Sequence, residues 1–153
     1  MMRAERNIFA GGFTLVEVIT VVMIIGVLVV IVTPCYLFQV EKARVGLAKT
    51  DLQAMKVALE ISAARAVNTY PELAEDARGV LRSFGLNSLT DPWGSSYYYG
   101  VKNQGREFIV YSQGPDLQPG GGDDIIATGL LNPREGQSVD TYGYALVQKL
   151  YVN

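Results

Sequence analysis

The sequence contains no histidine and only one cysteine, Cys35, among its 153 residues. Without histidine the chain cannot form Ser-His or Cys-His nucleophile pairs or histidine-ligated metal centres, and it lacks the usual general base near neutral pH. A lone cysteine cannot close a disulfide within the chain, and it excludes zinc and iron–sulfur sites built from several cysteines. These absences argue against an enzyme.

An excess of positive charge is also missing. The chain has 13 Lys and Arg against 15 Asp and Glu, a formal net charge of −2. A nucleic-acid-binding protein would normally present a basic face, so we expect no nucleic-acid partner. No Gly-x4-Gly-Lys-Ser/Thr motif for a phosphate-binding loop is present. The length allows one modest domain with an appendage.

Charge is almost absent from the N-terminal part, where Glu17 is the only charged residue from Phe13 to Phe38. A helix rises about 1.5 Å per residue, so about 20 apolar residues cross a hydrocarbon core of about 30 Å. The run ends in Thr33-Pro34-Cys35-Tyr36, without the small residues of a secretory cleavage site. We therefore expect residues 13–38 to form a retained membrane-spanning helix. Arg3 and Arg6 favour a cytoplasmic N-terminus.

Two residues of this segment are functional candidates. A carboxylate near the end of a membrane helix costs on the order of 2–3 kcal/mol unless it is paired or solvated, which singles out Glu17. The alternative is a Glu17 side chain that reaches water among the lipid headgroups. Pro34 removes one backbone donor and clashes with the preceding turn, so we expect it to kink or locally open the helix. The alternative is a proline that the membrane helix tolerates.

Residues 11–19, Gly-Gly-Phe-Thr-Leu-Val-Glu-Val-Ile, resemble the prepilin-type signal of type IV pilins and type II secretion pseudopilins. A short basic leader, glycine before the scissile bond, phenylalanine after it and glutamate as the fifth mature residue are all present. The resemblance implies that a prepilin peptidase cleaves between Gly12 and Phe13 and methylates the new amino group. It also implies that Glu17 of one subunit meets the Phe13 amine of another in a low-dielectric environment, and that Pro34 marks where the helix can unwind.

The rest of the chain predicts a head attached to a helical stem. Apolar residues at helical spacing from Val45 to Ala66 extend the helix to about Val67, with residues 39–67 as its amphipathic part. Residues 72–84 predict a short helix that ends at Gly85. Strands are expected at 96–101, 107–112 and 141–152, with a hairpin turn at 102–105. The predicted fold class is α+β, with the long N-terminal helix packed on a small antiparallel sheet in a head formed by residues 68–153.

Expected side-chain positions follow from the same patterns. We expect the stem to bury Val45, Ala48, Leu52, Met55, Leu59, Ala63 and Ala66. The short helix is expected to bury Leu73, Ala77, Val80, Leu81 and Phe84. In the last strand Tyr142, Tyr144, Leu146 and Leu150 are expected to share one face.

Two segments of the head resemble the G-type major pseudopilin. One is Asp91-Pro92-Trp93-Gly94 with the tyrosines that follow, which structurally predicts a turn anchored by Trp93. The other, residues 112–125, resembles the calcium loop of that family. By this resemblance Ca²⁺ is held by the side chains of Asp116, Asp123 and Asp124, with backbone carbonyls of Gln113 and Gln118 as further ligands. From composition alone, a solvated acidic turn explains the segment equally well.

The resemblance covers about residues 8–126 and implies a filament subunit. The expected product is a helical homopolymer, the periplasmic pseudopilus of type II secretion, anchored through the inner membrane before assembly. Expected partners are other copies, minor pseudopilins, the prepilin peptidase, the inner-membrane assembly platform and membrane lipid. The alternative is a type IV pilin of a surface fibre, although the paired C-terminal cysteines of most adhesive pilins are absent. A third hypothesis, a membrane-anchored enzyme that uses Asp123 and Asp124, is disfavoured because the sequence offers no supporting base. The resemblance does not extend to residues 126–153.

Overall fold

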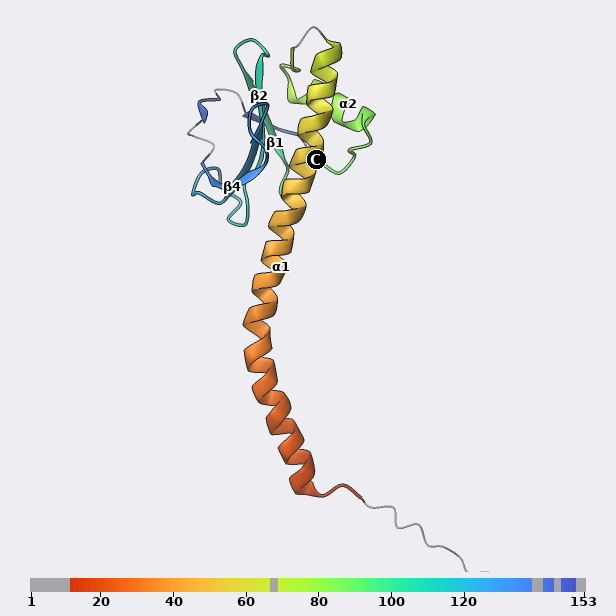
Figure 1. The fold of residues 1–153 in the computed structure, drawn as a ribbon, viewed down its shortest axis with the longest axis vertical. Coiled ribbons are helices and arrows are strands. Elements are labelled where there is room, and N and C mark those ends of the chain that lie inside the picture. Colours follow the sequence, from red (N-terminus) through yellow and green to blue (C-terminus); the bar gives the residue numbers. More distant parts are fainter. Residues whose placement is uncertain (1–11, 67–68, 139–141, 145–146, 151–153) are drawn as a thin grey trace, which may run out of the picture. The chain divides into compact units, whose positions relative to one another are not determined.

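The computed structural model describes residues 12–66, 69–138, 142–144 and 147–150 of the chain. The chain divides into two compact units, Met1–Val40 and Glu41–Asn153, which are described separately below. The helix α1, Leu15–Arg65, contributes to both (Figure 1). The long N-terminal helix and the small antiparallel sheet confirm the predicted α+β class.

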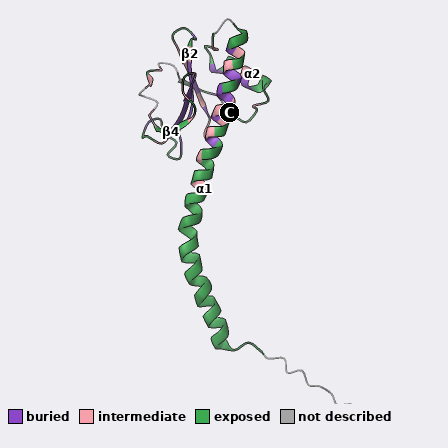
Figure 2. Ribbon diagram, in the orientation of Figure 1, coloured by how far each residue is buried: buried purple, intermediate pink, exposed green. Residues whose placement is uncertain are grey.

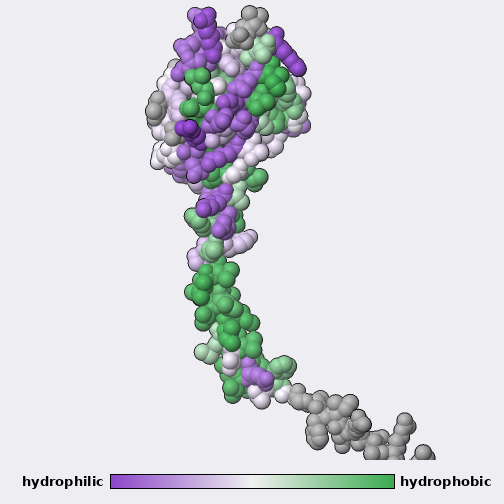
Figure 3. Space-filling view, in the orientation of Figure 1, coloured by the Kyte–Doolittle hydropathy of each residue, from purple (hydrophilic) through white to green (hydrophobic). Residues whose placement is uncertain are grey.

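In the first unit α1 is exposed along almost its whole length, and only Val40 is half-buried. Every described residue up to Gln39 is exposed, including the large apolar side chains from Phe13 to Phe38 (Figures 2 and 3). Within the described residues, this is the one helix long and apolar enough to cross a membrane. Its unburied apolar surface requires either lipid or protein as a covering.

The helix α1 continues through Pro34 without interruption. The helix therefore does not break at Pro34; the expected kink or local opening stays a prediction. Loss of one backbone donor is tolerated here because the neighbouring turns keep their hydrogen bonds, and the Thr33 hydroxyl adds a bond to the Val29 carbonyl oxygen at 2.7 Å. The predicted end of the helix at about Val67 lies outside the described residues.

The second unit contains a five-stranded antiparallel sheet in the order β4-β3-β2-β1-β5. Its strands are β1 Tyr98–Lys102, β2 Glu107–Ser112, β3 Asp124–Thr128, β4 Arg134–Gln137 and β5 Val147–Lys149. The predicted hairpin between β1 and β2 is confirmed. Asn103 and Gln104 adopt φ of 54° and 57°, the positive values of a turn that follows the natural twist of paired strands.

The two faces of the sheet are buried by different partners. Phe108, Val110, Ile125 and Ala127 join the main core, together with Leu52 and other residues of the stem. The alternate residues Ile109, Tyr111 and Ile126 form a smaller cluster covered by half-buried tyrosines. This alternation follows from the period of two in a strand. Of the predicted buried stem positions, all are buried or half-buried except Ala66, which is exposed at the end of the helix.

The short helix α2, Ala74–Ser83, confirms the prediction for residues 72–84. Gly85 ends it with φ +83°, and the Leu86 amide closes the last turn on the Leu81 carbonyl at 3.0 Å. Ala77 and Leu81 are buried and Val80 is half-buried. Leu73 and Phe84 are not buried: these residues are 54% and 39% exposed, and they are the cap residues that flank the two ends of the helix.

The C-terminal segment differs most from expectation. The single strand predicted at 141–152 is replaced by a short β5, and β3 and β4 were not predicted. Tyr142 and Tyr144 pack on the outer cluster, whereas Leu150 is in the main core, so they do not share a face. Leu146 lies outside the described residues. The chain crosses from one edge of the sheet to the other here, which an uninterrupted strand could not do.

Candidate functional site

The start of α1 places Thr14 and Glu17 in mutual contact. The Thr14 amide and hydroxyl both donate to Glu17 Oε2 at 3.3 Å, and the Glu17 amide donates to Thr14 Oγ1 at 3.2 Å. This reciprocal arrangement is a capping box, which satisfies backbone donors that the first helical turn leaves without partners. The Thr-x-x-Glu spacing at residues 14–17 was a signal for it in the sequence that our reasoning missed.

Glu17 consequently has a role within the single chain. Its carboxylate stabilises the helix start, where the helix dipole also favours negative charge. The side chain is nevertheless exposed, as is Phe13 at 85%. Phe13 and Glu17 therefore both remain accessible to a second molecule, while Pro34 lies further along the same helix.

In the second unit, Asp91 organises the turn formed by residues 91–95. Its buried carboxylate accepts hydrogen bonds from the backbone amides of Trp93 and Ser95 at 3.1 and 2.8 Å. The hydroxyl of Ser112 donates to its other oxygen at 2.6 Å. The sequence predicted a turn anchored by Trp93 here but gave Asp91 no role, although an Asp that opens a turn is the usual signal for such side-chain-to-backbone bonds.

The contact between Ser112 and Asp91 connects this turn to the acidic loop, defined as residues 112–125. The Gly114 amide donates to Ser112 Oγ at 3.1 Å. Gly114 itself has φ +68°, and a Cβ atom there would lie 2.5 Å from the Asp123 carbonyl oxygen. Glycine is therefore required at this position, both by the backbone conformation and by the close approach of the second half of the loop.

The three predicted calcium-binding aspartates do not have the same surroundings. Asp116 and Asp123 converge: a Cβ atom on Gly121 would lie 3.1 Å from a carboxylate oxygen of each. Asp124 is instead fully buried, and its Oδ2 accepts from the Gly120 amide at 2.8 Å. In the part of the chain that the structure describes, no three His, Cys, Asp or Glu side chains lie close enough together to hold a metal ion.

The two residues predicted to bind calcium through their backbone carbonyls, Gln113 and Gln118, also have different surroundings. The Gln113 residue is buried, and its side-chain oxygen accepts from the Tyr98 hydroxyl at 3.2 Å. Gln118 is exposed, and its amide donates to Asp116 Oδ1 at 2.8 Å. The Asp116 amide donates to Asp123 Oδ2 at 3.3 Å. The loop is thus ordered largely by its own carboxylates, which accept backbone hydrogen bonds.

Tyr97 and Tyr99, beside and within β1, bond to neighbouring parts of the head. The Tyr97 hydroxyl donates to Asp51 of α1 at 2.9 Å, and the Tyr99 hydroxyl donates to the Pro71 carbonyl at 2.6 Å. Burial first, and then the Asp51 carboxylate, raise the pKa of Tyr97 well above its usual value. Burial likewise raises the pKa of Tyr99, and it raises that of Tyr144 to about 12. These groups serve structure, because they stay neutral and hydrogen-bonded.

Comparison with known proteins gives a consistent result. The profile of the family described as "Type II secretion system (T2SS), protein G" matches residues 36–128. The chain is 29% identical over 138 residues to "Type II secretion system core protein G" of Pseudomonas aeruginosa, covering 81% of this chain and 94% of that protein. The protein of the same name from Klebsiella pneumoniae is 32% identical over 127 residues, covering 74% and 91%. That from Escherichia coli K12 is 30% identical over 138 residues, covering 81% and 94%. No solved structure gives a significant match.

Proposed function

Because this chain belongs to the type II secretion system protein G family, we propose that it is a major pseudopilin that polymerises into a periplasmic pseudopilus. The family match over most of the head carries this proposal. The exposed apolar helix supports it, because a helix with no covering in the single chain can pass from lipid to the packed core of a filament. The chain then acts as a structural subunit in protein export and not as an enzyme.

Removal of the leader between Gly12 and Phe13 would create a cationic amine near Glu17. In an apolar filament core, the amine of one copy would attract the Glu17 carboxylate of another far more strongly than it would in water. The capping box supports this pairing, because it orders the Glu17 side chain at the start of α1 and still leaves it exposed to a second copy. Methylation of the Phe13 amine by the prepilin peptidase keeps its positive charge.

The cellular setting follows from the same anchor. The chain would be a single-pass inner-membrane protein with its head in the periplasm. It would be extracted from lipid by the inner-membrane assembly platform and would join other copies and minor pseudopilins. The Pro34 position would allow local unwinding of α1 when the helices pack in the filament, a change relative to the continuous helix of the single chain.

Replacement of Glu17 tests the assembly step. Glu17→Gln keeps the acceptor that the capping box needs but removes the charge, whereas Glu17→Val removes both. We expect both variants to insert into the membrane and neither to form filaments at the normal rate. Filament yield in electron micrographs and membrane fractionation are the measurements. Normal filament formation by Glu17→Gln would show that the charge has no such role.

Deletion of the gene separates the two kinds of filament. If the chain is a pseudopilin, an enzyme that is normally extracellular should accumulate in the periplasm. If instead surface fibres vanish and secretion continues, the chain is a type IV pilin. The measurement is enzyme activity in the periplasmic and external fractions, with restoration by the unmodified gene as the control.

We further propose that the acidic loop holds structural Ca²⁺ through Asp116 and Asp123. Their carboxylates converge on the space beside Gly121, which a side chain at that position would fill. Calcium prefers such hard oxygen ligands and would neutralise two like charges. That Asp124 and the carbonyls of Gln113 and Gln118 complete the ligand set stays a prediction. Asp124 already accepts from Gly120, so it would contribute from a position inside the loop.

Thermal unfolding of the full chain in detergent tests this calcium site. Excess chelator should lower the unfolding temperature, and added calcium should restore it. Asp116→Asn should abolish the response to calcium, whereas Asp76→Asn, on the exposed surface of α2, should leave it unchanged. If the chelator does not move the unfolding temperature of the unmodified chain, calcium has no part in the structure.

A further inference from the structure

Two hollows lie beside the β1–β2 hairpin, at the end of β2 opposite to the acidic loop. The first has a volume of about 330 Å³ and is lined by three aromatic rings, those of Tyr70, Phe108 and Tyr144. The second has a volume of about 590 Å³ and is lined by four polar residues, Asn103, Gln104, Arg106 and Glu107. Arg106 and Glu107 line both hollows. The two hollows therefore form one cleft with an aromatic end and a polar end, called the hairpin cleft below.

The aromatic end of the hairpin cleft is held in place by the head itself. The ring centroids of Tyr70 and Phe108 are 4.4 Å apart, and the Tyr144 hydroxyl donates to the Phe108 carbonyl oxygen at 3.1 Å. Phe108 is fully buried, whereas Tyr70 and Tyr144 are half-buried and keep part of their surface accessible. Leu130, which also lines this end, is 88% exposed. A preformed hollow of this size and lining is typical of a small-molecule site.

Gly129 leaves the aromatic end open. It lines the same hollow, and a Cβ atom there would lie 3.4 Å from Phe108 Cε1 and 3.6 Å from the Tyr70 hydroxyl oxygen. Both are ordinary contact distances, and the Gly129 backbone lies outside the left-handed region, so its conformation does not require glycine. A larger side chain at Gly129 would consequently fill the space between the rings without straining the backbone.

The polar end offers hydrogen bonds of both kinds with little net charge. Asn103 and Gln104 are exposed, and each amide side chain supplies a donor group and an acceptor oxygen. Arg106 adds donors and Glu107 adds acceptors, and their opposite charges balance within the lining. Glu107 also accepts from the Asn103 side chain and forms an ion pair with Lys102 at 3.1 Å. A neutral ligand with many hydroxyl or amide groups would match this end.

Sugars combine the two properties that the hairpin cleft requires. The C–H face of a sugar ring packs on an aromatic ring, while its hydroxyl groups both donate and accept hydrogen bonds. A ligand with several phosphate groups would need more cations than Arg106 supplies. A lipid chain would leave the polar end without partners. A peptide cannot add to the sheet as a strand here, because β1 and β2 already have a neighbour on each side.

We propose that the hairpin cleft binds a neutral glycan, with one sugar ring against Tyr70 and Tyr144 and the next beside Asn103 and Gln104. This site goes beyond filament assembly, since its lining includes no residue of α1. Because most of the polar end is exposed, a single site should bind weakly, with a dissociation constant on the order of 1 mM. If the chain forms the proposed filament, many copies of the site would hold a long glycan together.

Titration of the full chain with neutral oligosaccharides tests the site, in a detergent whose head group is not a sugar. The probes are the tetramers of N-acetylglucosamine, of β-linked glucose and of α-linked glucose, and the NMR signals of the sugar report binding. We expect at least one tetramer to bind, and Gly129→Leu to weaken its binding at least about tenfold by filling the aromatic end. Arg106→Ala should also weaken it. Arg82→Ala, on the exposed surface of α2, should bind normally.

Each other outcome overturns the proposal. If no tetramer binds the unmodified chain, the cleft is not a glycan site, and if only a proline-rich peptide binds there, it is a peptide site. If a tetramer binds Gly129→Leu and Arg106→Ala as well as it binds Arg82→Ala, the sugar is held elsewhere. Should Gly129→Leu lower the unfolding temperature, the exposed Arg106→Ala decides alone. The filament and secretion assays do not depend on this cleft, so the proposed function can stand or fail separately.

Discussion

Trp93 and Glu41 are joined by a hydrogen bond of 2.7 Å from the indole Nε1 to the carboxylate Oε1. Glu41 is the first residue of the second unit, on α1, and Trp93 lies in the turn that Asp91 organises. The two residues are 52 positions apart in the sequence. This bond fixes the Trp93 turn to the stem at the point where the head begins.

Loss of the Glu41 acceptor should destabilise the head. Glu41→Ala leaves the half-buried indole N–H without its partner, and we expect the free energy of unfolding to fall by about 1 kcal/mol. Glu41→Gln keeps an acceptor oxygen and should cost less. Thermal or urea unfolding of the full chain in detergent, followed by tryptophan fluorescence, measures the difference. Equal stability of Glu41→Ala and the unmodified chain would show that water replaces the bond at no cost.

Replacement of Asp91 should have a larger effect. Asp91→Ala removes the acceptor for two backbone amides and the Ser112 hydroxyl, all in a buried site, so we expect a loss of about 3 kcal/mol. Asp76→Ala, on the exposed surface of α2, should change stability by less than about 0.5 kcal/mol. Urea unfolding of both variants checks the contrast. Similar behaviour of the two would contradict the role assigned to Asp91.

Alanine at Gly114 and alanine at Gly85 should destabilise the head by different amounts. Both have positive φ, +68° and +83°, so alanine is strained at either position by roughly 1–2 kcal/mol. Only at Gly114 does the new Cβ also meet a backbone oxygen, that of Asp123 at 2.5 Å, whereas Gly85 faces open space. We expect Gly114→Ala to be clearly the less stable variant by urea unfolding. The opposite order would show that the loop relaxes freely.

Stability should fall at alkaline pH. Unfolded tyrosines ionise near pH 10, whereas burial raises the pKa of Tyr144 to about 12 and raises those of Tyr97 and Tyr99 as well. The unfolded chain therefore binds fewer protons than the folded one above pH 10, and the free energy of unfolding decreases as pH rises from there. Tyr144→Phe should make this decrease shallower. Unfolding midpoints of both proteins, measured at successive pH values, test this. If the stability of Tyr144→Phe falls with pH as steeply as that of the unmodified chain, Tyr144 does not contribute to the decrease.

Local patterns predicted the helices and the hairpin because their signals are contained in short stretches. The stem shows helical spacing, and the turn before Glu107 contains the residues that positive φ favours. The strand β3 was missed because its five residues are all buried, so no alternation marks it and the run reads as part of the acidic loop. The strand β4 was missed because Arg134, Glu135 and Gln137 carry no strand signal. These residues form a strand because they pair with β3.

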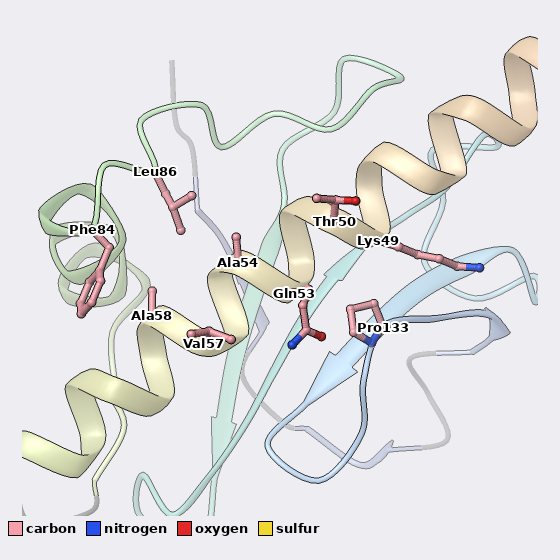
Figure 4. A pocket seen from close by; sticks show the side chains of 9 residues that line it. All are labelled: Lys49, Thr50, Gln53, Ala54, Val57, Ala58, Phe84, Leu86 and Pro133. Carbon is pink, nitrogen blue, oxygen red and sulfur yellow. The ribbon is translucent and has the colours of Figure 1, made fainter.

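The candidate site shows the same limit. Glu17 could be identified from the sequence because a carboxylate in an apolar run is conspicuous. The pocket beside Val57 could not be, because two of its other lining residues, Phe84 and Pro133, are distant from α1 in the sequence and meet it only after folding (Figure 4). Nor could spacing distinguish Asp124, which turns inward, from Asp116 and Asp123, which face each other.

The C-terminal strands have a consequence for crowded subunits. Open sheet edges act as templates for pairing with other chains, and a membrane filled with identical heads would multiply such encounters. Here β4 forms one edge and β5 the other, and both are short strands with polar or charged residues such as Glu135 and Lys149. Copies of this sheet that met at high concentration would therefore have little tendency to pair edge to edge.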